Sequence, residues 1–140
     1  MDTLTNKNIL LGITGSIAAY KAADISSRLK KEGCNIRVIM TKSSELFITE
    51  TTLESLSGNK VICENEDSTT LTNFKHLDIA KWADMILISP CTANFMNKLA
   101  NGHGDDLLST ICLAFNKKIY IAPAMNPDMW NNKVCQASIQ

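Results

Sequence analysis

Eight residues near the C-terminus, the segment 123–130 (PAMNPDMW), bring two thioethers, an amide and an indole close together. The segment follows an apolar run at 118–122, which predicts a buried strand, and Pro127 suits the first turn of a helix. In an open α/β sheet, ligands bind at the carboxyl ends of the strands. The segment is therefore a candidate ligand site, and the alternative is a methionine-rich turn that only fills the core.

A second candidate site follows the apolar run at 8–13, where the segment 12–17 (GITGSI) leads into a predicted helix. Ser16 is a suitable N-cap, and the helix is expected to continue to about Lys31, with Gly33 ending it. Backbone amides at a helix N-terminus and the helix dipole favour an anion, for which phosphate is the natural occupant. The alternative is a tight turn without a ligand.

The residues after the second predicted strand, 35–40, indicate the type of nucleotide. The turn at 12–17 is neither GxGxxG nor a P-loop, and NAD would require an acid at the end of that strand. The strand leads instead into Thr41, Lys42, Ser43 and Ser44, which suit a phosphate group better than a ribose diol. This pattern favours a mononucleotide, with NADP as the weaker option.

His76 lies between a polar segment, 64–75, and a predicted helical turn at 77–84. A histidine can exchange a proton near neutral pH, and a long loop in a compact domain is often functional. The alternative is an ordinary surface histidine. The next strand is predicted at 85–89 with Pro90 as its stop, and Thr92 or Asn94 then caps a helix.

Strands and helices alternate along the chain, which predicts one α/β domain with a doubly wound parallel sheet in a three-layer α/β/α sandwich. The net charge is zero with no basic run, so no nucleic-acid partner is expected, and no apolar stretch is long enough for a membrane span. Five cysteines without CxxC pairs predict reduced, buried thiols in a cytoplasmic protein. No metal-ligand spacing is visible.

Four segments together resemble the homo-oligomeric flavin-containing cysteine decarboxylases. They are 12–21 (GITGSIAAYK), 76–84 (HLDIAKWAD), 89–94 (SPCTAN) and 123–130 (PAMNPDMW). The resemblance covers about 7–132 and is strongest to the members that act in coenzyme A biosynthesis. It implies FMN as the cofactor, held by three segments. These comprise Gly15, Ser16 and Ile17; Thr41, Ser43 and Phe47; and Ser89, Thr92, Ala93, Asn94 and Phe95.

The same resemblance implies the chemistry. A carboxylate beta to a thiol is a poor leaving group, because loss of CO₂ would leave a carbanion without an electron sink. Oxidation of the thiol to a thioaldehyde by FMN supplies that sink. His76 resembles the acid/base group of the oxidative step. Asn126 resembles the amide that holds the substrate carboxylate, and Met125 lies beside it in the substrate site.

The implied substrate is phosphopantothenoylcysteine. A peptide with a C-terminal cysteine is the alternative, and a non-catalytic FMN-binding regulatory subunit is a third possibility. The family implies a homo-oligomer, a trimer or a dodecamer of trimers, with sites between subunits. His76 and Asn126 would then serve one site from different chains.

The sequence also departs from the family pattern. Members that complete the reaction carry a further segment that clamps the substrate and holds a cysteine, and the chain of residues 1–140 ends before it. We expect Cys135 to be a packing residue and not that cysteine. Cys91, Phe95 and the turn 102–104 stand where the family usually has small or hydroxyl residues, so they are expected to alter the flavin pocket slightly.

Overall fold

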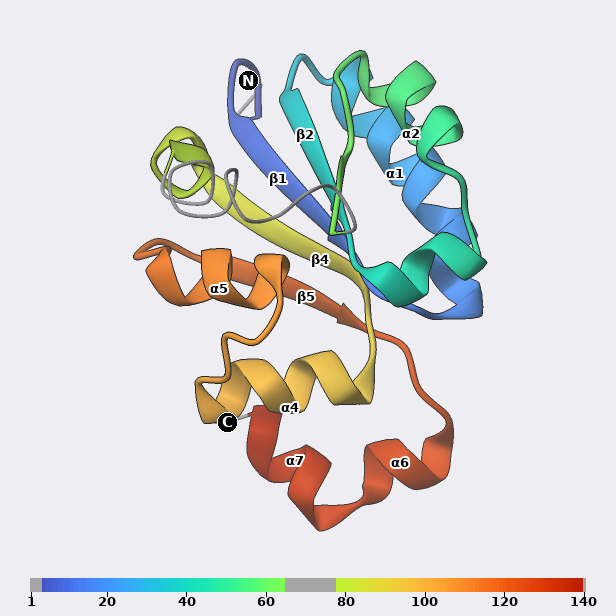
Figure 1. Ribbon diagram of the computed structural model, residues 1–140, viewed down its shortest axis with the longest axis vertical. Helices are drawn as coiled ribbons and strands as arrows, with labels where there is room; N and C mark the ends of the chain where they lie inside the picture. Colours follow the sequence, from blue (N-terminus) through green and yellow to red (C-terminus); the bar gives the residue numbers. More distant parts are fainter. Residues whose placement is uncertain (1–3, 65–77, 140) are drawn as a thin grey trace.

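The computed structural model describes residues 4–64 and 78–139, and its centre is a parallel β-sheet (Figure 1). The strand order is β3-β2-β1-β4-β5, and every pair of neighbours is parallel. The strands are β1 (Asn8–Ile13), β2 (Asn35–Met40), β3 (Ile62–Cys63), β4 (Met85–Cys91) and β5 (Ile119–Pro123). The predicted doubly wound parallel sheet is confirmed.

Helices follow most strands, as the alternation predicts. They are η1 (Ile17–Ala19), α1 (Tyr20–Lys31), η2 (Lys42–Leu46), α2 (Glu50–Ser57), α4 (Ala93–Asn101), α5 (Leu107–Ala114), α6 (Pro127–Asn131) and α7 (Lys133–Ile139), with a helical turn at 78–82. The glycine expected to end the first long helix, Gly33, has a φ of 88°. That left-handed conformation reverses the chain toward β2 at little steric cost.

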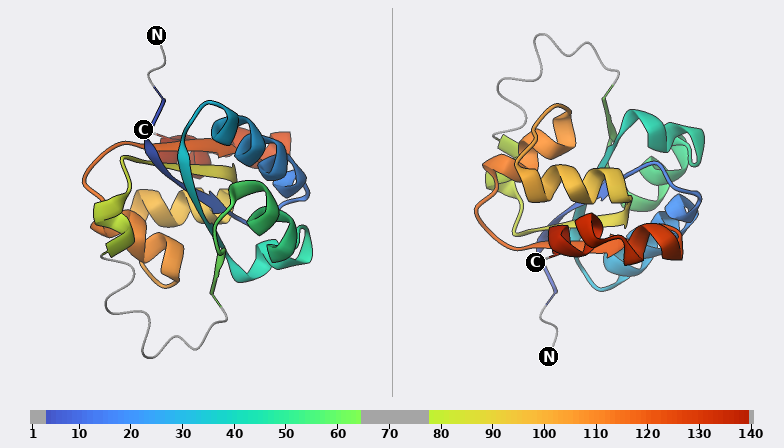
Figure 2. Two further views of the ribbon diagram at one scale, coloured as in Figure 1. Left: turned by 90° about the horizontal axis from the view of Figure 1, so that it is seen from above. Right: turned by 90° about the horizontal axis from the view of Figure 1, so that it is seen from below.

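Helices cover both faces of the sheet, which gives three layers (Figure 2). Alternate residues of β1 enter two separate cores because successive side chains of a strand point to opposite faces. Ile9, Leu11 and Ile13 pack in the core that includes Ala22 of α1 and Leu53 of α2. Leu10 packs in the other core, which includes residues of α4 and α5. The predicted three-layer sandwich is therefore confirmed.

Two sequence-based expectations about strands are wrong. Pro90 does not stop β4, which continues to Cys91 with a shift of register against β5 between Ile88 and Cys91. A proline fits at such an irregularity because its missing N–H is not needed there. The strand predicted at 118–122 forms as β5, but it lies at the sheet edge, and three of its five residues are exposed.

The buried positions of the cysteines agree with the sequence-based expectation. All five cysteines lie in the described part of the chain; all are buried, and none forms a disulfide. Cys135 packs in the same core as α4, as expected for a packing residue. Among the described helices, none has both the length and the apolar character needed to cross a bilayer.

Candidate active site

A cavity of about 470 Å³ opens where β1, β2 and β4 end. β1 is followed by β2 on one side of the sheet and has β4 as its neighbour on the other, so this is the point where the strand order reverses. Open α/β sheets bind ligands at that point, in pockets of about this size. The lining residues are Thr14, Thr41, Lys42, Ser43, Leu46, Glu64, Thr92, Asn94, Phe95, Lys98 and Asp106.

Thr14 joins the ends of the two central strands. Its buried hydroxyl donates to the Pro90 carbonyl oxygen at 2.6 Å and accepts from the Thr92 backbone N–H at 3.0 Å. A buried hydroxyl that both donates and accepts has its hydrogen-bonding capacity largely satisfied, so it stiffens the wall it belongs to. The backbone N–H of Thr14 also donates to the Pro90 carbonyl oxygen, at 3.3 Å, so the backbone and side chain of one residue together connect the turns after β1 and β4.

The turn after β1 packs directly against the segment after β2. A Cβ atom added to Gly15 would collide with the Ser43 side chain, so only glycine allows this approach. Thr41 supports the same wall: its Oγ1 donates to the Ile13 carbonyl oxygen at 3.2 Å and lies 3.4 Å from Ser43 Oγ. Ser16 is an N-cap as predicted, although of the short helix η1, and its Oγ accepts from the Ala18 N–H.

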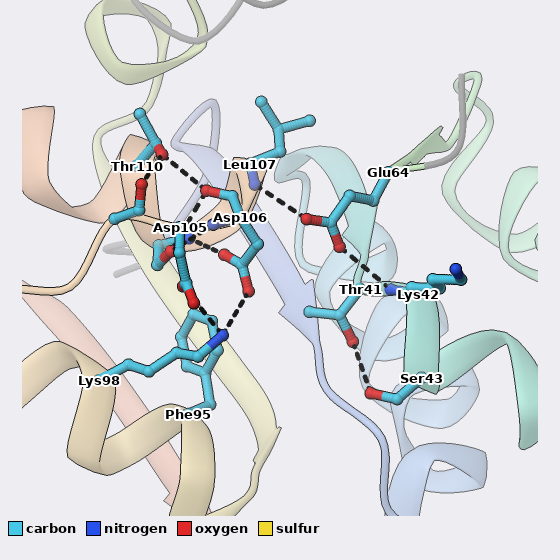
Figure 3. Close-up of polar contacts among 12 residues, drawn as sticks. Thr41, Lys42, Ser43, Glu64, Phe95, Lys98, Asp105, Asp106, Leu107 and Thr110 are labelled. Atoms are coloured by element: carbon cyan, nitrogen blue, oxygen red, sulfur yellow. Dashed lines mark hydrogen bonds and ion pairs between the residues drawn. The ribbon is translucent and has the colours of Figure 1, made fainter. Parts of the chain in front are cut away.

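The opposite wall comes from α4 and the start of α5. Thr92 is the N-cap of α4, and its Oγ1 accepts from the Phe95 N–H at 3.2 Å. The Nζ atom of Lys98 lies 3.0 Å from Oδ1 of Asp105 and 3.2 Å from Oδ2 of Asp106 (Figure 3). Burial opposes the charged form of Lys98, but the bonds to the two aspartates outweigh it and raise its pKa. The bond from Lys98 in turn lowers the pKa of Asp105.

Five of the predicted cofactor residues line the cavity: Thr41, Ser43, Thr92, Asn94 and Phe95. The remaining six do not line it. Gly15, Ser16 and Ile17 form the adjacent turn, Ser89 and Ala93 are buried beside it, and Phe47 ends η2 with its side chain partly exposed. The three predicted segments thus converge on one end of the sheet.

Several lining residues were not predicted as cofactor residues. Thr14 lies inside the glycine-containing turn, and Lys42 lies between Thr41 and Ser43. Both residues therefore belong to segments that the sequence already marked as following a strand. Lys98 follows Asn94 by four residues on the same helix, and that spacing places two residues on one face. No pattern in the sequence indicates Glu64 or Asp106, because their place in the cavity depends on how β3 and α5 pack.

The predicted substrate residues lie elsewhere. Asn126 is the exposed N-cap of α6, and its Oδ1 accepts from the Met129 N–H at 2.9 Å. Met125 is partly buried against the core. Neither lines the cavity. His76 lies outside the described residues, so its role stays a prediction.

A cluster of side chains that could bind a metal ion lies at β3, although the sequence spacing did not indicate one. The atoms of Glu45, Glu50 and Cys63 that could act as metal ligands are all within 4.8 Å of one another. Burial raises the pKa of the Cys63 thiol far above its usual range, and hydrogen bonds to Glu50 and Glu45 raise it further. The thiol therefore stays protonated and acts as a hydrogen-bond donor at neutral pH. Burial also raises the pKa values of Cys91 and Cys112 to about 12.

The cavity fits a ligand with a phosphate group. Thr41, Ser43 and Thr92 line it, and a glycine turn packs directly against Ser43. Two lysines also line it, Lys42 and Lys98, and Lys98 is already paired with aspartates. Phosphate can be held by backbone amides and hydroxyls without a basic surface. Fold and site together define an α/β protein with a ligand-sized cavity at its switch point.

The chain belongs to the flavoprotein family, whose pattern it matches over residues 1–140. It is 44% identical, over 139 residues, to the coenzyme A biosynthesis bifunctional protein CoaBC of Vibrio vulnificus. That match covers 99% of this chain and 35% of the relative. The chain thus spans about a third of the length of such curated relatives.

Solved structures agree with this assignment. The FMN-dependent cysteine decarboxylase SpaF superposes with a TM-score of 0.88 at 29% identity, over 98% of this chain and 79% of SpaF. A mutant PPC decarboxylase complexed with pantothenoylaminoethenethiol superposes with a TM-score of 0.81 at 30% identity, over 96% of this chain and 75% of that one. The family resemblance inferred from the motifs is confirmed.

Proposed function

We propose that this chain binds FMN and catalyses the oxidative decarboxylation of phosphopantothenoylcysteine in coenzyme A biosynthesis. The observation that carries the proposal is a cavity at the switch point that residues of two of the three predicted segments line, with the third, the Gly15 turn, packed directly against Ser43. The 44% identity to CoaBC and the similarity to PPC decarboxylase support the choice of substrate.

FMN, when bound, supplies the oxidation of the substrate thiol that makes loss of CO₂ possible. Thr41, Ser43 and Thr92 would hold it through their hydroxyls, with its phosphate toward the Gly15 turn. Asn126 would orient the substrate: its capping bond uses only the Oδ1 atom, so its Nδ2 group can donate to the substrate carboxylate. His76 would accept and return the proton of the oxidative step.

A cysteine at the end of a peptide is the second candidate substrate. The peptidyl-cysteine decarboxylase EpiD superposes with a TM-score of 0.82 at 29% identity, over 96% of this chain and 79% of that one, which is about as well as PPC decarboxylase does. The fold therefore supports both substrates equally. The higher identity to CoaBC favours phosphopantothenoylcysteine. The third candidate, an FMN-binding subunit without turnover, predicts bound flavin and no CO₂.

The proposed active form is a homo-oligomer, a trimer or a larger assembly of trimers. Its support is the number of large apolar side chains exposed on the surface of the described chain, Ile17, Tyr20, Leu46, Val134 and others among them. Such side chains mark an interface where they gather into one contiguous patch. Sedimentation of the FMN-loaded protein measures the assembly, and an active monomer would contradict it.

The proposal is tested by the absorbance spectrum of the purified protein, followed by anaerobic addition of phosphopantothenoylcysteine. We expect a flavin spectrum that bleaches as CO₂ is released. A peptide ending in cysteine serves as the comparison substrate. Bleaching with that peptide alone would establish the second candidate, and bound flavin that stays oxidised with both would favour the third. A protein without flavin would contradict all three.

The role of His76 is tested by His76→Asn. We expect the variant to keep its flavin and to lose decarboxylation, because an amide cannot exchange a proton near neutral pH. Absorbance measures the first property and CO₂ release the second. A variant that keeps wild-type turnover would refute the acid/base role.

A further inference from the structure

Glu64, the residue that follows β3, connects two walls of the cavity (Figure 3). Its Oε2 accepts from the backbone N–H of Lys42 at 3.3 Å, where η2 begins. Its Oε1 accepts from the backbone N–H of Leu107 at 3.3 Å, where α5 begins. The two donors lie on opposite sides of the carboxylate, so one side chain spans from the β2 side of the cavity to the α5 side.

The two amides belong to helix ends whose own caps leave them without a partner. Thr41, the N-cap of η2, makes no side-chain capping bond. Asp106, the N-cap of α5, uses its Oδ1 for the Ser109 N–H at 2.7 Å. The first N–H groups of a helix have no acceptor within the helix, and a carboxylate is a favourable acceptor there because the helix dipole assists it.

We propose that Glu64 is a positioning residue that holds the η2 wall and the α5 wall at the separation that FMN requires. The inference rests on the proposed function. Residues on both sides of the connection line the cavity, with Ser43 on the η2 side and Asp106, bonded to Lys98, on the α5 side. If the connection is lost, the walls can move apart, and bound FMN is released faster.

A competing explanation is that the carboxylate occupies space or a pair of amides that FMN itself needs. Glu64 would then oppose binding, and its removal would make FMN bind faster and more tightly. The two explanations predict opposite signs for the change in affinity, so one experiment separates them.

The chain offers a matched control in Glu54. Its Oε1 accepts from the backbone N–H of Val61 at 3.2 Å, just before β3, and the residue does not line the cavity. The experiment compares Glu64→Ala and Glu64→Gln with Glu54→Ala and Glu54→Gln. The glutamine at position 64 keeps one acceptor oxygen, so it retains part of the connection if the alanine variant folds poorly.

Two measurements are made on each variant. Hydrogen exchange of the Lys42 and Leu107 amides, measured without FMN, reports the connection itself. Flavin fluorescence in stopped flow reports the rate of FMN release. We expect Glu64→Ala to lose protection at both amides and to release FMN about ten-fold faster, since bonds to a charged acceptor are lost. Glu64→Gln is expected in between, and both Glu54 variants are expected to match the wild type.

Unchanged protection at both amides, unchanged FMN release, or tighter binding by Glu64→Ala would each overturn the inference. Equal effects of the Glu54 variants on release would show that any weakening near β3 suffices, which also overturns it. A wild-type protein that binds no FMN would instead overturn the proposed function, and the role of Glu64 in cofactor binding with it. Amide exchange distinguishes this case because it needs no cofactor.

Discussion

A motif that we predict to be functional follows each of β1 and β5, but the protein surrounds the two very differently. β1 is the central strand, and five of its six residues are buried; β5 is an edge strand, and three of its five residues are exposed. After β1, Thr14 is buried and Gly15 packs against Ser43. After β5, α6 contains no buried residue, and Met129 and Trp130 are 44% and 38% exposed.

The difference indicates that the ends of β1 and β5 have different roles. Around the proposed cofactor cavity, hydrogen bonds within the chain connect β1, β2 and β4. The Asn126 end is open, as expected for a surface that a substrate and a neighbouring subunit would complete. Three substitutions, each with a matched control, test whether the two ends differ in this way.

The largest effect is expected at the β1 end, from Gly15→Val. A branched side chain would collide with Ser43 and displace the turn that approaches the phosphate, so FMN affinity is expected to fall by more than about 100-fold. Flavin fluorescence titration measures it. Gly102→Asn is the control: it changes a left-handed glycine with open space around it, which asparagine tolerates. Wild-type FMN affinity in Gly15→Val would refute the packing argument.

At the β5 end, Asn126→Asp is expected to lower turnover by about 100-fold or more with FMN binding unchanged. Aspartate caps a helix as well as asparagine does, but a carboxylate repels the substrate carboxylate and cannot donate to it. Steady-state CO₂ release and flavin absorbance separate the two effects. Asn132→Asp is the control because Asn132 accepts from the Val134 N–H at 2.9 Å in a similar cap. If both variants lose turnover alike, charge near α6 is the cause and Asn126 has no special role.

The smallest of the three effects is expected from Ser16→Ala. Loss of the bond from the Ala18 N–H removes an N-cap, which costs about 1 kcal/mol of stability, and removes a hydroxyl next to the cavity. Thermal unfolding and FMN titration measure the two consequences, and we expect about ten-fold weaker FMN binding. Thr49→Ala removes the cap of α2, away from the cavity, so it is expected to lose stability alone. Equal FMN affinity in the two variants would assign Ser16 a purely structural role.

Much of the fold was predictable because its determinants are local. The apolar run at 8–13 and the strand predicted at 35–40 both form at the expected bounds, and Gly33 ends the first long helix as expected. The exposure of β5 was not predictable, since an edge position depends on the order of strands in the sheet.

The same limit applies to the site. Thr41, Ser43 and Thr92 were found because they follow strands, and strand ends meet at one edge of a parallel sheet. Glu64 was missed because its partner amides are 22 and 43 residues away in the sequence, and only tertiary packing brings them together.

The hydroxyl of Thr14 also bears on the order of folding. It bonds to Pro90 and Thr92, 76 and 78 residues further along the chain. Contacts this distant in sequence close a long loop and form slowly. This wall of the cavity therefore exists only after β4 has docked beside β1, and we expect the proposed FMN binding to follow that step. Recovery of bound flavin during refolding would report the moment at which the central sheet is assembled.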